Sequence, residues 1–200
     1  MEGLDLAAAS VEELFDAAGA LRRGHFLLKS GRHSDRYLEK FAVLQYPALA
    51  VEIGRRLAAA LEPQDPTLVV GPTTGGVLLA FETARQLEAR LGRTVRGVFA
   101  EPAERGVRSL RRGWPVAADE RVVLVDDILT TGASLDETAR AVRAAGVEPL
   151  AAAVIVDRST SPVELGFPIG SLGRIEIEAW EPGACPHCAA GAPLVKPGSS

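Results

Sequence analysis

Apolar positions along the chain recur with two different periods. Near the N-terminus they follow a helical period behind Ser10 and Glu13, which have capping-box spacing, and this predicts a helix over 11–22. A second helix is predicted over 47–61, because Pro47 is a favourable first helical residue. The positions of this second helix that are expected to face inward are Ala50, Ile53, Leu57 and Leu61.

Short, continuous apolar runs then alternate with helical patterns. Strands are predicted over 67–71, 94–100, 121–125 and 148–156, and helices over 75–91 and 134–145. Such an alternation produces right-handed crossovers and a parallel sheet covered by helices on both faces. The sequence therefore predicts an α/β fold, in which ligands bind beyond the carboxyl ends of the strands.

The 200 residues are expected to form a single domain. We expect a small hood with its N-terminal helix over about 1–46, a core over about 47–160, and a C-terminal segment over about 161–200. Residues 26–41 are polar and turn-rich, and the tail from Pro182 onward is rich in Gly, Pro and Ala, so we expect it to be irregular.

Composition and charge exclude several classes of protein. The chain is 47% hydrophobic and 24% charged, which is ordinary for a globular protein. The net charge of −4 argues against general binding to nucleic acid or to anionic membranes. The longest apolar run, 150–156, is far shorter than the roughly 20 residues that span a bilayer. The N-terminus is acidic and lacks a secretory signal pattern, and two cysteines cannot form a disulfide framework. We therefore expect a cytoplasmic protein.

The run 122–134 carries the strongest chemical signal. A buried strand ends in Asp126 and Asp127, and a loop from Thr130 to Ser134 then enters a helix. Backbone N–H groups, hydroxyls and the positive end of a helix suit a phosphate, whereas the two acids suit hydroxyl groups or a metal. A sugar phosphate satisfies both demands. The alternative is that the acids only cap the next helix.

Two further segments follow predicted strands. Gly71-Pro-Thr-Thr-Gly-Gly76 lets a backbone approach a ligand closely, although by itself it also suits an ordinary tight turn. The stretch 101–113 holds four arginines within eight residues. It is either a solvated surface face or a flexible lid that closes over the ligand and excludes water.

The run 122–134 resembles the phosphoribosyl diphosphate (PRPP) signature of type I phosphoribosyltransferases, with four apolar residues, two acids, two apolar residues and Thr-Thr-Gly. It differs from a Walker loop, which needs Gly-Lys-Ser/Thr. The resemblance implies that fold, with Asp126 and Asp127 on the ribose hydroxyls and the 130–134 loop on the 5′-phosphate. The PRPP-binding residues implied are Lys29, Thr73, Thr74, Gly75, Asp126, Asp127, Ile128, Leu129, Thr130, Thr131, Gly132, Ala133 and Ser134.

The segment 26–37 resembles the Leu-Lys-Ser-Gly-Arg-x-Ser-x-x-Tyr segment of orotate phosphoribosyltransferases, which purine phosphoribosyltransferases lack. The resemblance implies that Lys29 reaches the diphosphate and that the segment forms part of a hood over the base. Arg158 follows the last strand and suits the carboxylate of orotate, because arginine binds carboxylates with two parallel hydrogen bonds. The resemblance places Thr130 beside it. Alternatively, Lys29 and Arg32 are only surface charges, and Arg158 caps a helix or faces solvent.

The arginine-rich stretch departs from the family. Family members often carry lysines and a histidine in the catalytic lid, and residues 101–113 contain neither. Arg105 is the best substitute, but an arginine with a pKa above about 12 is a poor proton donor, so we expect an electrostatic lid. The catalytic residues expected are Lys29, Arg105, Asp126 and Asp127.

The implied reaction converts orotate and PRPP to orotidine 5′-monophosphate and diphosphate, in the biosynthesis of UMP. Magnesium is expected to be carried by PRPP with no direct protein ligand, and the family implies a homodimer whose lid is shared between subunits. The alternatives are a purine or uracil phosphoribosyltransferase, or a PRPP-sensing regulator without catalysis. A regulator should add a nucleic-acid-binding module or a basic face, for which the chain has neither spare length nor charge.

Cys185, His187 and Cys188 have partial zinc-ligand spacing. A closed structural zinc site needs four ligands, and this cluster offers three. A dimer, or His25 or His33, could complete the site. Between these alternatives we expect free thiols in the tail.

Overall fold

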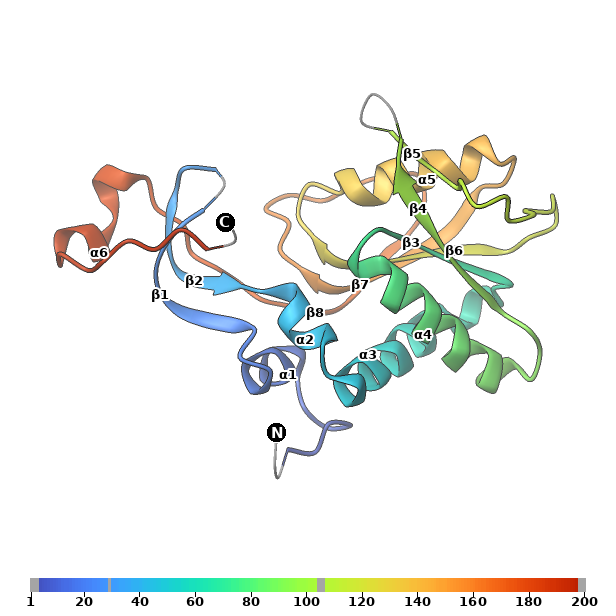
Figure 1. Cartoon of the computed structure of the whole chain (residues 1–200), viewed down its shortest axis with the longest axis horizontal. Helices are drawn as coiled ribbons and strands as arrows, with labels where there is room; N and C mark the ends of the chain where they lie inside the picture. Colours follow the sequence, from blue (N-terminus) through green and yellow to red (C-terminus); the bar gives the residue numbers. More distant parts are fainter. Residues whose placement is uncertain (1–3, 29, 104–106, 198–200) are drawn as a thin grey trace.

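The computed structural model describes residues 4–28, 30–103 and 107–197. A six-stranded sheet in the order β5-β4-β3-β6-β7-β8 forms the larger part of the molecule, and a separate two-stranded hairpin stands to one side (Figure 1). The hairpin consists of β1 (Leu21–Leu27) and β2 (His33–Leu38). The sheet consists of β3 (Leu68–Pro72), β4 (Arg96–Pro102), β5 (Arg108–Ser109), β6 (Val122–Leu129), β7 (Pro149–Asp157) and β8 (Ile169–Arg174).

All neighbouring strands of the sheet run parallel except β4 and β5, which are antiparallel. The helices are α1 (Val11–Ala17), α2 (Lys40–Leu44), α3 (Pro47–Leu61), α4 (Gly75–Leu91), α5 (Ala133–Ala144) and α6 (Pro186–Ala189), with short 3-10 helices η1 (Glu62–Gln64) and η3 (Pro182–Ala184). None of the helices in these described ranges combines the length and hydropathy that a membrane span requires.

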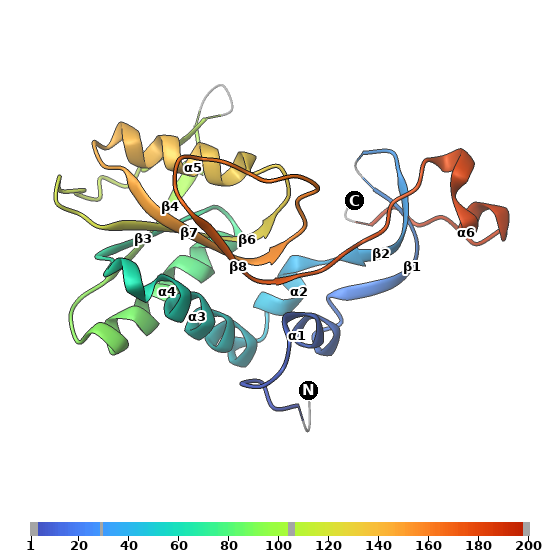
Figure 2. The same ribbon diagram turned by 180° about the vertical axis from the view of Figure 1, so that it is seen from behind.

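The sheet separates two hydrophobic cores. Val69 and Val123 point to the face covered by α3 and α4, whereas Val70 and Leu124 point to the face covered by α5. Figures 1 and 2 show these helices on opposite sides of the strands. Since alternate strand residues face opposite sides and both sides are apolar, the predicted parallel sheet with two covered faces is confirmed.

The helices α3 and α4 have the bounds that the sequence predicts. On α3, three of the four positions expected to face inward are buried, but Ala50 is only partly buried and Leu49 lies fully in the core. The prediction for α1 is too long. This helix ends at Ala17 because Gly19 adopts a positive φ of 63°, after which the chain enters β1.

The segment 26–41, which is polar and turn-rich in sequence, is mostly regular, because it forms much of the hairpin and α2. Polar residues dominate both strands, so the alternation that marks a half-buried strand is missing. The C-terminal tail supplies the missing packing. The tail runs beside the hairpin (Figure 2), where Val195 pairs with Phe26 and Trp180 pairs with His33.

The tail is more regular than expected. The residues of η3 and α6 form helical turns, so the prediction of an irregular tail is wrong there. Strands β5 and β8 and the short helix η1 were not predicted, and β6 extends four residues beyond the predicted strand. The proposed division of the chain near residues 46 and 160 stays a prediction.

Candidate active site

The three strand ends that carry the predicted motifs lie at one edge of the sheet. Strands β3 and β6 run parallel with Val70 opposite Leu124, and β6 and β7 run parallel with Leu129 opposite Asp157. The Arg158 N–H donates a hydrogen bond of 2.8 Å to the Leu129 carbonyl. The loop after β3, the acids at the end of β6 and the arginine after β7 therefore meet at the carboxyl edge, where parallel sheets bind ligands.

Two buried carboxylates form the centre of this edge. Asp126 and Asp127 are 5% and 3% exposed. The Lys40 ammonium, at the start of α2, lies 2.9 Å from Oδ2 and 3.1 Å from Oδ1 of Asp127. The N–H of Ile128 donates to Asp127 and that of Asp127 donates to Asp126, each at 2.8 Å. Lys40 thus compensates one of two adjacent negative charges, and the pair retains acceptor atoms for hydroxyl groups.

Burial, followed by the negative charge of Asp127, raises the pKa of Asp126 from 3.8 to about 6. Hydrogen bonds from the Asp127 N–H and the Ser134 hydroxyl, and the charge of Lys40, act in the opposite direction. Since the folded state holds its proton more tightly than the unfolded state, this group lowers stability as pH rises from 3.8 through about 6. Below 3.8 that penalty is absent.

The same titration predicts a pH dependence of PRPP binding. If the Asp126 carboxylate accepts a ribose hydroxyl, the KM for PRPP should rise about tenfold between pH 7 and pH 5, because about one carboxyl in ten is ionised one unit below its pKa. Steady-state kinetics across this range measure the effect. The D126N variant is the control, because it keeps the titration of the substrate and loses that of the enzyme. If D126N showed the same rise in KM at low pH, the pH dependence would come from protonation of PRPP instead of Asp126.

The loop after β3 lies against the acid pair, and two glycines permit this. A Cβ atom on Gly71 would lie 2.2 Å from the carbonyl oxygen of Gly76, and one on Gly75 would lie 2.6 Å from Oδ2 of Asp127. The peptide between Thr73 and Thr74 is cis. Thr73 is partly buried and Thr74 exposed, so the loop presents backbone and hydroxyl groups beside the carboxylates.

The loop after β6 leads directly into α5. Gly132 precedes the helix with a φ of 79°, and a Cβ there would lie 2.4 Å from Cγ1 of Val163, so the site requires glycine on both grounds. Thr130, Thr131 and Ala133 are exposed around it. Exposed backbone and hydroxyl groups at the positive end of a twelve-residue helix suit a phosphate group.

Arg158 lines a pocket of about 280 Å³ together with Arg32 from the hairpin loop and Arg174 from the end of β8. Burial lowers the pKa of the Arg158 guanidinium. Arg32 donates to the Ala179 carbonyl and lies 3.3 Å from Glu181, whereas Arg174 pairs with Asp157 at 3.2 Å. Arg158 therefore brings a cationic group to a pocket formed jointly by the sheet edge and the hairpin.

Lys29 and Arg105, two of the expected catalytic residues, lie outside the described residues. The described part of the arginine-rich stretch folds back as β5 onto β4. There Arg108 donates to the carbonyl and hydroxyl oxygens of Thr73, at 3.3 and 3.2 Å, and pairs with Glu137 at 3.1 Å. Part of the expected lid is thus attached to the loop after β3.

Sequence reasoning missed Lys40 and Arg108 as site residues. Lys40 had a recognisable signal, because the chain has only three lysines among its 22 basic residues. An ammonium is a compact charge that suits a single carboxylate, whereas guanidinium groups serve nearly everywhere else in this chain. Arg108 had no such signal, because it is one of four similar arginines and only the pairing of β5 with β4 selects it.

Comparisons with known proteins agree with this geometry. The profile of the family described as "Phosphoribosyl transferase domain" matches residues 42–181. Orotate phosphoribosyltransferase of Caldicellulosiruptor bescii is 45% identical over 187 residues, which cover 94% of this chain and 95% of the relative. The Thermotoga maritima protein of the same name is 39% identical over 189 residues, 94% of this chain and 97% of the relative.

Solved structures show the same fold. The crystal structure of orotate phosphoribosyltransferase from Aeropyrum pernix has a TM-score of 0.60 and 26% identity, and it covers 82% of this chain and 93% of that chain. The Mycobacterium tuberculosis structure in complex with Fe(III) dicitrate has a TM-score of 0.66 at 22% identity, with coverages of 82% and 96%.

The profile match over residues 42–181, together with the fold and the acid pair between the loops after β3 and β6, shows that the chain belongs to the phosphoribosyltransferase family. Its enzymatic class is that of a pentosyltransferase. Within the family the chain is one of the orotate phosphoribosyltransferases, because relatives of that name match it over nearly its full length at 38–45% identity.

Proposed function

We propose that the enzyme transfers the 5-phosphoribosyl group of PRPP to orotate and so makes orotidine 5′-monophosphate for UMP biosynthesis. The bond between ribose C1 and the diphosphate oxygen breaks, and diphosphate leaves with its electron pair. A ring nitrogen of orotate forms a bond to C1, and the proton of that nitrogen is released to solvent. One observation carries this proposal: a single sheet edge holds a buried acid pair, two glycine-dependent loops and an arginine pocket. These are three sites for the three parts of the reacting pair, namely ribose, phosphates and base.

The carboxylates of Asp126 and Asp127 accept hydrogen bonds from the ribose hydroxyls. The loop of Thr130, Thr131, Gly132, Ala133 and Ser134, together with Ile128 and Leu129 before it, receives the 5′-phosphate at the start of α5. The loop of Thr73, Thr74 and Gly75 receives the diphosphate, and Arg108 holds this loop in position. Fixing the donor in this way aligns C1 with the incoming nitrogen.

Arg158 binds the carboxylate of orotate, with Thr130 beside it. Positive charge develops on C1 as diphosphate leaves, and negative charge develops on the departing oxygens. We assign neutralisation of the diphosphate to Lys29 and to the lid residue Arg105. An arginine there stabilises charge without transferring a proton.

The residues at the acid pair fit a magnesium ion that PRPP itself carries. Within the described ranges, no third acidic, cysteine or histidine side chain joins Asp126 and Asp127 in a metal-binding cluster. Lys40 occupies the outer side of Asp127, which leaves too few free carboxylate oxygens for an all-protein cage. Magnesium prefers phosphates with one or two carboxylates, and it would supply charge neutralisation to the diphosphate.

We also propose a homodimer whose lid reaches the neighbouring subunit. Exposed apolar side chains on α4 support it: Leu78 is 52% and Phe81 is 66% exposed. Phe41 on α2, Val51 on α3 and Val107 before β5 are exposed as well. Large exposed apolar side chains are common at interfaces. The cytoplasmic location stays a prediction.

Ultraviolet absorbance of orotate tests the activity directly. Purified enzyme with PRPP and magnesium should consume orotate, and omission of either component should stop the reaction. Parallel reactions hold adenine, hypoxanthine, guanine and uracil. Turnover of one of those bases instead of orotate would overturn the assigned substrate, and PRPP binding without any turnover would favour the regulator.

The substitution R158A is expected to lower kcat/KM for orotate about 10²-fold, since it removes a charge-assisted pair of hydrogen bonds worth about 1.5–3 kcal/mol. The Kd for PRPP, measured by calorimetry, should change little. R140A, which removes an exposed arginine paired with Asp136 on α5, is the matched control and should keep both values. An equal loss of orotate and PRPP affinity in R158A would refute its role.

A further inference from the structure

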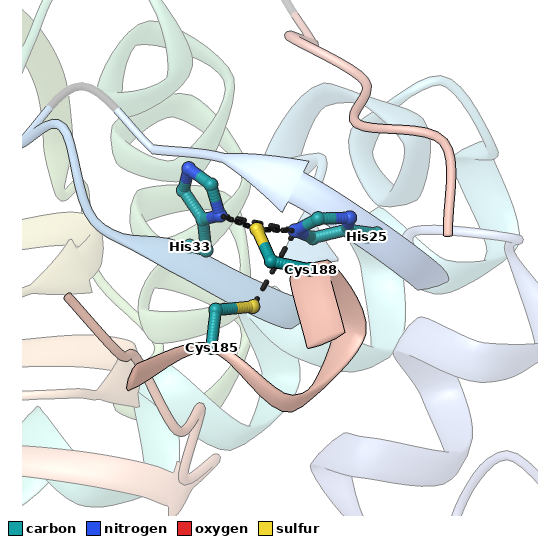
Figure 3. A group of neighbouring side chains, drawn as sticks. All are labelled: His25, His33, Cys185 and Cys188. Atoms are coloured by element: carbon teal, nitrogen blue, oxygen red, sulfur yellow. Dashed lines mark hydrogen bonds between the residues drawn. The ribbon is translucent and has the colours of Figure 1, made fainter. Parts of the chain in front are cut away.

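Four potential metal ligands, none of them a residue of the candidate active site, converge between the hairpin and the C-terminal tail (Figure 3). His25 lies on β1, His33 begins β2, and Cys185 and Cys188 belong to the turn of α6. The four ligand atoms all lie within 4.8 Å of one another.

The separations between these atoms match a tetrahedral site. With metal–nitrogen bonds of about 2.0–2.1 Å and metal–sulfur bonds of about 2.3 Å, neighbouring ligands should lie about 3.3 Å (N···N) and about 3.6 Å (N···S) apart. Nε2 of His25 and Nδ1 of His33 are 3.0 Å apart. The sulfur of Cys188 is 3.2 Å from Nδ1 of His33, and those of Cys185 and Cys188 are 3.4 and 3.7 Å from Nε2 of His25.

The orientation and burial of the ligands also suit a metal. Nδ1 of His25 lies 2.9 Å from the Ala192 carbonyl, so this nitrogen is the donor and Nε2 carries its lone pair toward the cluster. A hydrogen bond of this kind commonly orients metal-binding histidines. His25, His33 and Cys185 are buried, whereas Cys188 is exposed and provides a route of entry.

We propose that His25, His33, Cys185 and Cys188 bind one Zn²⁺ ion per chain, as a structural site. Binding displaces the two thiol protons to solvent, and two thiolates then balance the charge of the ion. Two imidazoles with two thiolates form a closed set, which leaves no position for a substrate. The thiolates favour zinc over magnesium or calcium. This proposal departs from the free thiols that we expected from the sequence, and it does not depend on the proposed function.

His187, which the sequence offered as a third ligand, has another place. Its ring lies 5.5 Å from that of His25, nearly parallel to it, and 5.7 Å from that of Trp180, measured between ring centres. It therefore packs beside the ligands and is absent from the converging set. The proposed site therefore differs from the sequence motif, because its histidine ligands are His25 and His33 and not His187.

The ion would attach the tail to the hairpin. The hairpin loop carries Arg32, whose guanidinium contacts the Ala179 carbonyl in the same tail, and Trp180 pairs with His33. Zinc at this position would add to the four backbone hydrogen bonds that the described residues of the hairpin and the tail exchange. It would thereby fix the wall of the Arg158 pocket that the hairpin contributes.

Metal content of the wild-type protein is the first test. Protein loaded with ZnCl₂ and then desalted should retain one zinc per chain by elemental analysis. Cobalt in place of zinc should show the visible bands of tetrahedral Co²⁺ together with a thiolate charge-transfer band. Protein that retains no zinc and gives an octahedral cobalt spectrum would overturn the proposal. So would a Cys185–Cys188 disulfide, found by mass, that persists after reduction and reloading with zinc.

Variants test the ligand set. H33A and C188S should each lose the charge-transfer intensity or the tetrahedral bands and release zinc to a chelator at least tenfold faster. Cys188 is exposed, so C188S keeps the fold even if H33A does not. H187A, from the same tail, is the matched control and should retain zinc with an unchanged cobalt spectrum. Loss of zinc in H187A with retention in H33A and C188S would overturn the assigned ligands.

Discussion

Joint replacement of Asp126 and Asp127 by asparagine is expected to lower kcat/KM for PRPP about 10³-fold, since two hydrogen bonds to charged groups are worth about 1.5–3 kcal/mol each. The amides keep the size of the side chains but accept hydrogen bonds less strongly than carboxylates. Lys40, which contacts Asp127 at 2.9 Å, is 39% exposed, so its ammonium can turn to water when that charge is removed. The loss should therefore appear in PRPP binding rather than in folding.

Calorimetric titration with PRPP and thermal unfolding separate these two effects. PRPP affinity should fall, whereas Tm should stay unchanged or rise, because burial and the neighbouring charge already disfavour ionised Asp126. D136N is the matched control, since Asp136 lies in the first turn of α5 and pairs with exposed Arg140. Unchanged PRPP affinity in the double variant would refute the role of the acid pair.

The substitution G71A is expected to lower the free energy of unfolding by about 3 kcal/mol, which is the upper range for overpacking a tight interior. Its Cβ would lie 2.2 Å from the Gly76 carbonyl oxygen and 2.7 Å from the carbonyl carbon. Both are backbone atoms, so neither can rotate away. Strand β3 and helix α4 must separate, and this displaces the loop of Thr73, Thr74 and Gly75 from the acid pair.

For G71A, a decrease in Tm of about 6–12 °C is expected by thermal unfolding. A loss in kcat/KM of about 10²-fold should accompany it, since a displacement near 1 Å at a reacting centre has that effect. G170A is the control, because a Cβ on this strand glycine would approach Ala152 to only 3.9 Å, an ordinary contact. If G71A retained both its Tm and its activity, the close approach of β3 to α4 would not be required.

The periodic parts of the fold could be predicted because the residues that favour each helix locally are also the ones that it buries in the core. Residues 47–61 and 75–91 have a helical period of apolar positions, and these are the faces that α3 and α4 bury. The hairpin could not be predicted in this way. Its strands are held by contacts with a tail more than 140 residues away along the chain, such as the pair Phe26 and Val195.

Part of the candidate site could also be predicted from the sequence, and part could not. The acids at the end of β6 and the loop before α5 are contiguous in the chain, so their spacing alone indicates phosphate and hydroxyl binding. Lys40 and Arg108 become site residues only because α2 and β5 bring them to Asp127 and Thr73. The zinc ligands follow the same principle, since two histidines and two cysteines from opposite ends of the chain meet at one point.

The sequence by itself determined the sheet with its covering helices and the places of the loops after β3 and β6, for which it predicts phosphate binding. It could do so because hydrophobic period and motif spacing act over a few neighbouring residues. Only the tertiary structure decided which cations serve the acid pair, which histidines join the cysteines, and how the tail completes the hairpin. Those contacts join residues far apart along the chain, and their geometry arises only when the sheet and the hairpin have folded.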